Sequence, residues 1–471
     1  MNREIGRETG EFQQTSEQSS ILRVAVITSF ITTFMGSALN LSIPQMEEQF
    51  GVSAAMIGWV VTAFTLSVAA LSVPFGKLAD ATGRRRVFLL GIILFVVFSV
   101  MCAFSPNIWM LLLCRVLQGV ASSMIFATNN AILISVFPPE QRGRVLGTSV
   151  AGTYIGLSAG PVIGGILNHY INWQSIFIMS AVIAAISLVI AIKGIPKKPM
   201  KDTSSGGIDI AGNILYIACI VVTLYGLTNL SVMKYAWIIL IAGIVLGAVF
   251  VITEKKAKDP VIRISMFTQD AAFTLSNLAA LLNYGATFAI SYLMSIYLQI
   301  IMGYSSQTAG LIIIAMPLMQ AIFSPTMGRL SDRIAPYKLA TAGMAICAAG
   351  LICFSLVGLD TPLFLIILIL IMEGFGFSVF SSPNSNAIMS CVEKKDYSIA
   401  QSIQATMRTV GHTSSMAIVT IVIGMQLGNT TLAEAEPAQL VHTMHTCFAV
   451  FIVLCIAGTF MSMKRRKTDV N

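Results

Sequence analysis

The chain has 471 residues, of which 56% are hydrophobic and only 11% charged, against about a quarter charged in ordinary soluble domains. Its 29 Lys and Arg and 21 Asp and Glu residues cannot cover the surface of a soluble protein of this size. This composition excludes a soluble enzyme, a nucleic-acid-binding protein and a disordered chain, and it predicts an all-α integral membrane protein.

Taken in chain order, a polar tail without an apolar signal region comes first, and apolar stretches of bilayer-spanning length follow it. We expect fourteen spans, near residues 23–44, 54–75, 87–105, 108–137, 145–168, 174–194, 208–229, 235–253, 271–301, 308–328, 338–357, 363–389, 400–425 and 442–463. The stretch 271–301 is longer than a bilayer requires, which a tilt or an end lying along the interface would explain.

The longest polar connections flank the seventh and eighth spans, which indicates two six-span halves with two inserted helices. The expected division is a cytoplasmic tail 1–22, a first half 23–194, a linker with two extra spans 195–270, a second half 271–463 and a cytoplasmic tail 464–471.

The basic residues orient the spans, because cytoplasmic loops carry an excess of Lys and Arg. With both termini in the cytoplasm, all basic residues except Arg115, Arg408 and Lys234 fall in tails or cytoplasmic loops. The tryptophans then lie near the outer interface, where amphipathic rings prefer to sit; they are Trp59, Trp109, Trp173 and Trp237.

Motifs for covalent or metal chemistry are missing from the sequence. The eight cysteines form no CxxC pair, and no phosphate-binding loop, HExxH or Ser/His/Asp arrangement occurs. We therefore expect no enzyme activity, no metal and no cofactor, and any energy that the protein uses would come from a gradient.

An internal repeat supports the two halves. The segment Gly76-Lys77-Leu78-Ala79-Asp80, followed by Gly83 and Arg84, is echoed by Gly328-Arg329-Leu330-Ser331-Asp332 in a later loop. A weaker echo at nearly the same separation relates Gln118-Gly119 and Asn129 to Glu373-Gly374 and Asn384. Repeated halves around a midplane site are the usual plan of secondary transporters.

Four motifs in order resemble the major facilitator superfamily. Residues 76–86 are similar to its G-x-L-a-D-r-x-G-r-r loop, and 111–119 to its fourth-span motif with a buried arginine. Residues 156–165 resemble the antiporter motif G-x-x-x-G-P-x-x-G-G, and 374–389 a motif near the end of the chain. With fourteen spans, the chain resembles the drug:proton antiporter branch that includes quaternary-ammonium and tetracycline exporters.

The resemblance implies that the first loop and the fifth span form a conformational gate between the halves, with Asp80 holding the outward-facing state. A basic loop that only sets topology, and a glycine-rich helix that only packs tightly, are the alternatives. The expected gate residues are Gly76, Asp80, Gly83, Arg84, Gly156, Gly160, Pro161, Gly164, Gly165, Gly328 and Asp332.

The resemblance implies that Arg115 takes part in proton movement or substrate binding, and Arg115 and Glu373 are the expected proton-coupling residues. A central arginine costs about 2.5–3.5 kcal/mol to insert, so Arg115 should face a cavity or a partner; a purely structural role is the alternative. Glu373 is the carboxylate nearest mid-membrane, and such a group can exchange a proton or attract a cation. It could instead be satisfied by a helix contact.

One position departs from the resembled branch. Many fourteen-span members carry an aspartate in the first span, nine residues before a proline, and Met35 occupies that place before Pro44 here.

Arg408 and His412 share a face of the thirteenth span and form either a proton relay or a packing pair.

If the superfamily arrangement holds, the first, fourth, ninth and twelfth spans line the cavity. Aromatic rings beside a carboxylate suit flat lipophilic cations. The expected substrate-binding residues are Asn40, Gln118, Phe126, Asn283, Tyr284, Tyr292, Phe377 and Asn384.

Together these features predict a monomeric exporter of lipophilic, cationic compounds in the plasma membrane, driven by proton entry. A facilitator or symporter for a small metabolite is the first alternative. A transporter-like sensor or membrane enzyme would need an effector domain or a catalytic cluster, which the sequence does not show.

Overall fold

The computed structural model describes residues 16–196, 209–427 and 436–465, apart from residues 53, 231, 232 and 234. Every regular element in these ranges is helical. Fourteen of the helices or helical runs are long and apolar enough to cross a membrane. The predicted all-α membrane fold with fourteen spans is therefore confirmed.

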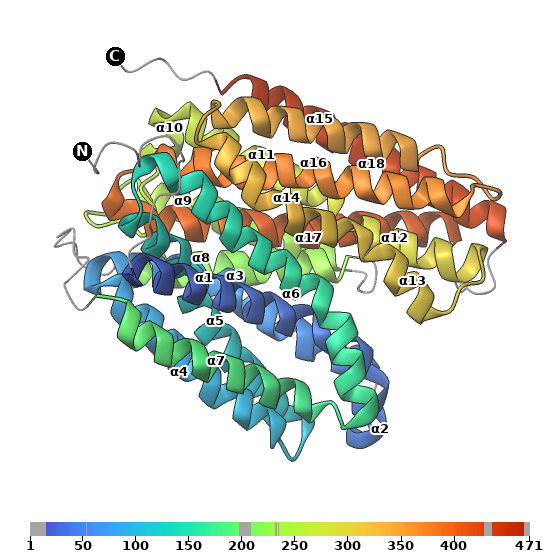
Figure 1. The fold of residues 1–471 in the computed structure, drawn as a ribbon, viewed down its shortest axis with the longest axis horizontal. Coiled ribbons are helices and arrows are strands. Elements are labelled where there is room, and N and C mark those ends of the chain that lie inside the picture. Colours follow the sequence, from blue (N-terminus) through green and yellow to red (C-terminus); the bar gives the residue numbers. More distant parts are fainter. Residues whose placement is uncertain are drawn as a thin grey trace, which may run out of the picture.

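The first half contains six spans and three short connecting helices (Figure 1). The spans are α1 (Ser16–Ser37), α3 (Ala54–Thr82), α4 (Arg84–Ala103), α5 (Ile108–Val136), α6 (Arg142–Tyr170) and α7 (Gln174–Gly194). The connecting helices are η2 (Ala38–Ser42), α2 (Ile43–Phe50) and η3 (Pro139–Gln141). The structure is described from Ser16 onward, and α1 is already helical there, so the helix includes residues before the predicted span start at residue 23.

Two further spans, α8 (Ile210–Thr228) and α9 (Ala236–Glu254), form a helical hairpin between the halves. Asp209 caps α8, because its side chain accepts a hydrogen bond from the Gly212 N–H at 2.8 Å. These helices are the seventh and eighth predicted spans.

The second half repeats the six-span plan. Its elements are α10 (Ser265–Gln269), α11 (Ala271–Thr287), α12 (Ile290–Ile296), the π-helical η4 (Tyr297–Ile301), α13 (Ser306–Ile313), α14 (Ala315–Ser331), α15 (Pro336–Phe354), α16 (Leu363–Ser390), η5 (Lys394–Asp396), α17 (Tyr397–Leu427) and α18 (Pro437–Met463). The long predicted span 271–301 is one path through the bundle, divided near Phe288 into α11, α12 and η4.

Each half has its own apolar core. Rings such as Phe88, Phe95 and Phe177 fill the first half, and Phe354 and Phe448 stack in the second with centroids 5.3 Å apart. A third cluster mixes both halves; it includes Val73, Leu146, Ile399 and Phe250 of α9. The halves are therefore separate packing units that share apolar contacts along one boundary.

That boundary, called the seam below, is closed at the end of the bundle where α1 begins and α18 ends, called the terminal end below. Two helix pairs make the most extensive contacts across the seam: α3 packs against α17, and α6 against α14. Figure 1 shows the first-half spans diverging from the second half toward the opposite end. The two crossings are the structural counterpart of the sequence repeat, because α3 and α14 carry the repeated loops at their ends.

Candidate functional site

A cavity lies between the halves and encloses about 480 Å³ of space, part of it open to solvent. Helices α1, α5 and α6 of the first half and α11, α16 and α17 of the second provide its walls. The lining residues are Ser29, Phe126, Asn129, Asn130, Ser149, Val150, Thr153, Tyr154, Tyr284, Ser381, Ser385, Gln401, Gln404 and Arg408. The cavity is called the central cavity below.

Hydrogen bonds tie most of its polar groups to the helices. Asn129 donates to the Ser29 hydroxyl at 2.9 Å and to the Ala25 carbonyl at 3.1 Å, and Ser149 donates to the Asn130 carbonyl at 2.9 Å. Gln404 donates its amide to Ser385 at 2.6 Å, while its own carbonyl oxygen has no hydrogen-bond partner among the described residues. The cavity thus presents amide and hydroxyl groups held in fixed directions.

Arg408 is the charged residue of this lining, and none of the described lining residues is acidic. Its guanidinium lies 5.5 Å from the centre of the Phe126 ring. The central cavity can therefore accept a hydrogen-bonding or anionic group at Arg408, and it offers no carboxylate to a cation.

An aromatic cluster closes one side of the central cavity. The Phe377 ring lies edge-on to Tyr154 at 5.5 Å and tilted against Tyr284 at 5.6 Å. His412 in turn packs between Tyr284 and Phe288, at 5.4 Å and 4.0 Å. Because Tyr154 belongs to the first half and the other rings to the second, the cluster joins the halves across the cavity.

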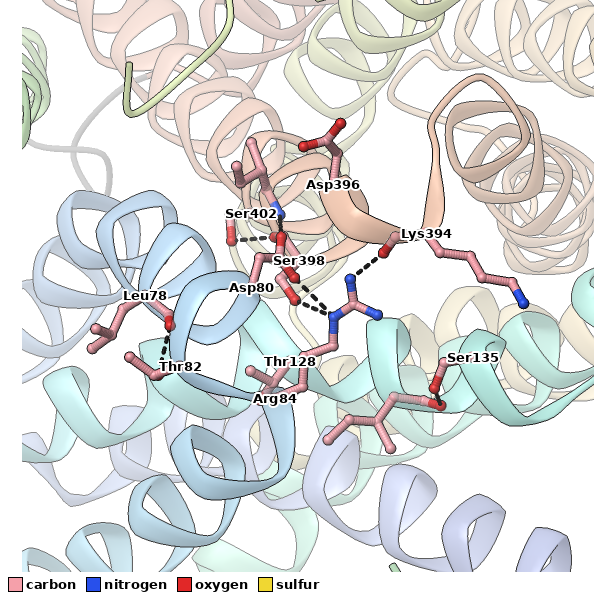
Figure 2. A network of polar contacts seen from close by, with 12 residues as sticks. Leu78, Asp80, Thr82, Arg84, Thr128, Ser135, Lys394, Asp396, Ser398 and Ser402 are labelled. Atoms are coloured by element: carbon pink, nitrogen blue, oxygen red, sulfur yellow. Dashed lines mark hydrogen bonds and ion pairs between the residues drawn. The ribbon is translucent and has the colours of Figure 1, made fainter. Parts of the chain in front are cut away.

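The first seam contact joins the end of α3 to the start of α17 (Figure 2). Asp80 forms a buried ion pair with Arg84 at 2.8 Å, and its other oxygen accepts the Ile399 N–H of α17 at 3.3 Å. Arg84 also donates to the Ser398 hydroxyl at 3.1 Å and to the Lys394 carbonyl. A first-half carboxylate therefore lies at the amino end of a second-half helix, where anions are favoured.

The second seam contact reverses these roles. Asp332, at the end of α14, accepts the Gly143 N–H at 2.6 Å and the Arg144 N–H at 2.9 Å at the start of α6. Burial raises the pKa of Asp332, and the two backbone donors act in the opposite direction. Asn386 of α16 also donates to this carboxylate at 3.4 Å, whereas the side-chain donor to Asp80 in the first contact is Arg84.

Glycines bring the helices together at both crossings. A Cβ on Gly76 would lie 2.9 Å from the Ser398 carbonyl oxygen, and one on Gly328 would lie 3.0 Å from the Gly147 Cα. Gly83, with φ at 110°, forms the turn that leads into α4. These predicted gate residues all lie at the seam or in its loop, and Gly143 and Gly147 join them.

The fifth-span glycines pack within the first half. Gly156, Gly160 and Gly164 lie against the backbone or small side chains of α1 and η2, such as Ser37 and Ala38. Gly165 continues the same helix, and the side chain of Pro161 lies outside the described part of the chain. Where α6 meets α14 across the seam, the small residues are instead Gly143 and Gly147.

Arg115 lies inside the first half, away from the central cavity lining. It is fully buried and donates to the Val60 carbonyl at 2.8 Å and to Gln118 at 2.6 Å. Its guanidinium lies 4.3 Å from the centre of the Phe64 ring. Gln118 extends this hydrogen-bond network, because it donates to the Ser99 hydroxyl of α4 at 2.7 Å.

Glu373 lies inside the second half, at the position that the sequence repeat pairs with Gln118, and it too is outside the cavity lining. It is fully buried, neither carboxyl oxygen has a hydrogen-bond partner among the described residues, and the Cys347 thiol lies nearby. A Cβ on Gly350 would lie 2.7 Å from the Glu373 Oε1 atom, so the glycine at this position of α15 leaves room for the Glu373 side chain. Asn283 is also buried and lies near the same Cys347 thiol.

The remaining predicted substrate residues are dispersed. Asn384 donates to the Ser276 carbonyl at 3.3 Å and accepts from Arg465 at 2.6 Å, near the terminal end; burial lowers the pKa of Arg465 to about 10. Tyr292 is 39% exposed. The side chain of Asn40 lies outside the described part. Of the predicted set, only Phe126 and Tyr284 line the central cavity, and Phe377 packs on its rings.

Sequence reasoning missed most of the lining because it assigned no substrate role to the spans α6 and α17. A signal was present, since polar residues repeat at helical spacing inside both spans. Gln401, Gln404 and Arg408 share one face of α17, and Ser149 and Thr153 share one face of α6.

Two repeated helical halves that enclose a polar cavity and close over it at one end form the architecture of a secondary membrane transporter. Within the described residues no cluster of His, Cys, Asp or Glu could hold a metal ion.

The chain belongs to the Major Facilitator Superfamily, whose family model matches residues 25–267 and 277–470. It is a multi-pass membrane transporter rather than an enzyme.

Among curated proteins, the chain is 29% identical to the riboflavin transporter RibZ of Clostridioides difficile (strain 630), over 95% of this chain and 98% of the relative. It is 25% identical to the multidrug resistance protein Stp of Mycobacterium tuberculosis (strain ATCC 25618 / H37Rv), over 85% and 75%. Its fold matches the human organic anion transporter MFSD10 (TETRAN) with a TM-score of 0.69 at 15% identity, over 95% and 100%.

Proposed function

We propose that the chain transports a planar, polar heteroaromatic compound of the riboflavin class across the cell membrane by alternating access through the central cavity. The observation that carries this proposal is the lining itself, which combines aromatic rings with amides, hydroxyls and one arginine and has no acidic group among its described residues.

This lining matches the chemistry of a flavin. Its ring system is flat and uncharged, so Phe126 and Tyr284 can stack on it. Its carbonyl-rich edge can accept from Arg408, and its imide N–H can donate to the Gln404 carbonyl oxygen, which has no partner in the described structure. The similarity to RibZ over nearly the full length of both chains supports the same substrate class.

We further propose that Glu373 binds the coupling proton. An ionised carboxylate with only a thiol as donor would be very costly in this packing, whereas a protonated one is tolerated. Glu373 reaches the cavity indirectly, because the Cys347 thiol interacts with both Glu373 and Asn283, and Tyr284, the next residue of α11, lines the cavity.

In this proposal the terminal end faces the cytoplasm, both termini are cytoplasmic, and the monomer is the working unit. The distribution of basic residues supports that orientation. The closed seam at the terminal end then corresponds to the outward-facing state, held by Asp80, Arg84 and Asp332.

The test is transport of radiolabelled riboflavin into proteoliposomes that contain the purified chain. Arg408→Gln and Gln404→Ala should each lower kcat/KM for riboflavin by about tenfold or more, the effect of one lost polar contact to the substrate. Gln426→Ala is the matched control, because Gln426 lies on the same helix but bonds Thr446. Equal activity of all three variants would contradict the proposal.

Export of lipophilic cations in exchange for protons is the second candidate, favoured by the similarity to Stp and other resistance proteins. The same vesicles distinguish the two when loaded with ethidium. Ethidium efflux that collapses with an uncoupler, without riboflavin transport, would establish drug export and replace the flavin proposal.

A further inference from the structure

A second cavity lies where α8 covers the crossing of α3 and α17. It encloses about 330 Å³, part of it open to the surroundings, and is called the α8 cavity below. Its walls come from both halves and from the inserted hairpin, and they include Trp59 and Thr65 of α3, Tyr225 and Thr228 of α8, and Thr409 and Thr413 of α17.

A stacked aromatic pair forms one wall of the α8 cavity. The Trp59 and Tyr225 rings lie 5.7 Å apart, with 26° between their planes. A flat aromatic ligand can extend such a stack, and aromatic pairs prefer this offset arrangement.

Threonines form much of the remaining wall. Thr409 and Thr413 donate their hydroxyl protons to backbone carbonyls one turn earlier, at 3.1 Å and 3.0 Å. Thr65 and Thr228 do the same at 3.2 Å and 2.8 Å. With their protons used in this way, the hydroxyl oxygens can only accept, so a matching ligand must carry hydrogen-bond donors. None of the described lining residues is charged, so the matching ligand is neutral.

The α8 helix is attached to both halves around this cavity. Its Tyr216 hydroxyl bonds the Thr406 hydroxyl of α17 at 2.9 Å, while its Tyr225 ring stacks on Trp59 of α3. If the halves rock as alternating access requires, α3 and α17 move relative to each other, and the cavity between them changes shape.

We propose that the α8 cavity is a second binding site, for an uncharged planar aromatic compound with N–H donors that arrives from the lipid side. Its occupancy holds α3, α8 and α17 in the present arrangement and so inhibits transport without competing for the central cavity. The inhibition rests on the proposed alternating access, whereas the binding does not.

The experiment measures equilibrium binding of lumichrome, a neutral tricyclic compound with two N–H donors, to the full chain in lipid nanodiscs. Tyr225→Ala should weaken one saturable component about fivefold by removing half of the stacked pair. Tyr225→Phe, which keeps the ring, should leave it unchanged. Thr413→Val, which keeps the shape and removes an acceptor, should weaken the same component.

Tyr284→Ala separates the two cavities, because Tyr284 lines only the central one. A component sensitive to Tyr225→Ala and insensitive to Tyr284→Ala supports the second site, even if riboflavin is not transported. The proposal is overturned if no component depends on Tyr225, or if Tyr284→Ala removes the same one. Binding in detergent that disappears in nanodiscs would also overturn it, because lipid chains would then fill the cavity.

Discussion

Glu373 and Arg115 are each buried inside their own half, and neither lines the central cavity. Hydropathy could predict that both side chains are unfavourable to insert into a membrane, and that each therefore has a partner or a function, since a charge in a span requires compensation. It could not predict the direction in which they point. That direction depends on which helix presents a glycine, such as Gly350, or a carbonyl, such as that of Val60, to the side chain.

Substitution of Glu373 by Gln tests the proton proposal at the residue scale. The amide has nearly the same volume and no charge, so the fold and riboflavin binding should be retained. Transport driven by a pH gradient should fall by about a hundredfold or more, since general acid–base groups typically contribute that much. The measurement compares riboflavin transport into proteoliposomes with and without an imposed pH gradient.

Unchanged gradient-driven uptake in Glu373→Gln would show that the proton binds elsewhere. Counterflow is the exchange of labelled for unlabelled substrate and needs no pH gradient. Its loss would show instead that the variant is structurally damaged. Exchange without a gradient is thus the control within the same preparation.

Asp332 gives a pH prediction, because burial raises its pKa in the closed seam. A raised carboxyl pKa means that the closed fold holds the proton more tightly than the opened or unfolded chain. The contribution of Asp332 to stability is thus present below its ordinary pKa of about 3.9 and is lost as the pH rises through the raised value. Wild type should lose thermal stability relative to Asp332→Asn across this window, as measured by unfolding midpoints. A difference that does not change with pH would contradict the prediction.

The spans themselves were predictable at the element scale, because lipid forces each segment to satisfy its own backbone hydrogen bonds as a helix. The breaks were not. The division near Phe288 and the π-helical turn at Tyr297–Ile301 occur inside a continuous apolar stretch. The parts played by α6 and α17 in the cavity also escaped prediction, since helix polarity alone does not reveal which face meets the other half.

Helices α6 and α14 can cross this closely because the residues at the contact are glycines, which have no side chain. Gly328→Ala would place a Cβ about 3.0 Å from the Gly147 Cα and nearer still to the Gly143 carbonyl. Overpacking of this kind typically costs about 1–3 kcal/mol. We expect a lower unfolding temperature and slower transport, because the helices must separate.

The matched control is Gly310→Ala on α13, where an added Cβ meets nothing within 4 Å. An alanine inside a helix is favoured over glycine by roughly 0.5–1 kcal/mol, so this variant should be as stable as wild type or more so. Equal behaviour of the two variants would show that the crossing is not tightly packed.

The Tyr216–Thr406 pair is a polar contact between the inserted hairpin and the second half. Tyr216→Phe and Thr406→Val should each lower stability by about 1 kcal/mol, and the double variant should cost less than their sum, because both remove the same bond. Unfolding midpoints of the four proteins measure the coupling. Strict additivity would show that the hydroxyls do not bond.

At the scale of the whole molecule, the seam is closed by two similar contacts made with different chemistry. The first includes the guanidinium of Arg84, and the second relies on backbone N–H groups and Asn386. Arg84→Gln should weaken closure by about tenfold or more, as expected for hydrogen bonds to a charged group. Spin-label distances between the end of α3 and the start of α17 would report the shift toward the open seam.

Arg85→Gln is the control for this prediction. Arg85 has the same charge in the same loop, but it donates to the Ile195 and Ile192 carbonyls within its own half. Its loss should leave the spin-label distances unchanged. A similar shift in both variants would assign the effect to the net charge of the loop.

The reciprocal arrangement of Asp80 and Asp332, in which each half supplies one carboxylate and one helix start, makes the closed seam a bivalent interaction. Once either contact has formed, the other meets its partner at a high effective concentration, so the two together bind far better than either alone. Opening therefore proceeds as a single cooperative event, and a transporter with one damaged contact should fail to stay closed instead of closing half as well.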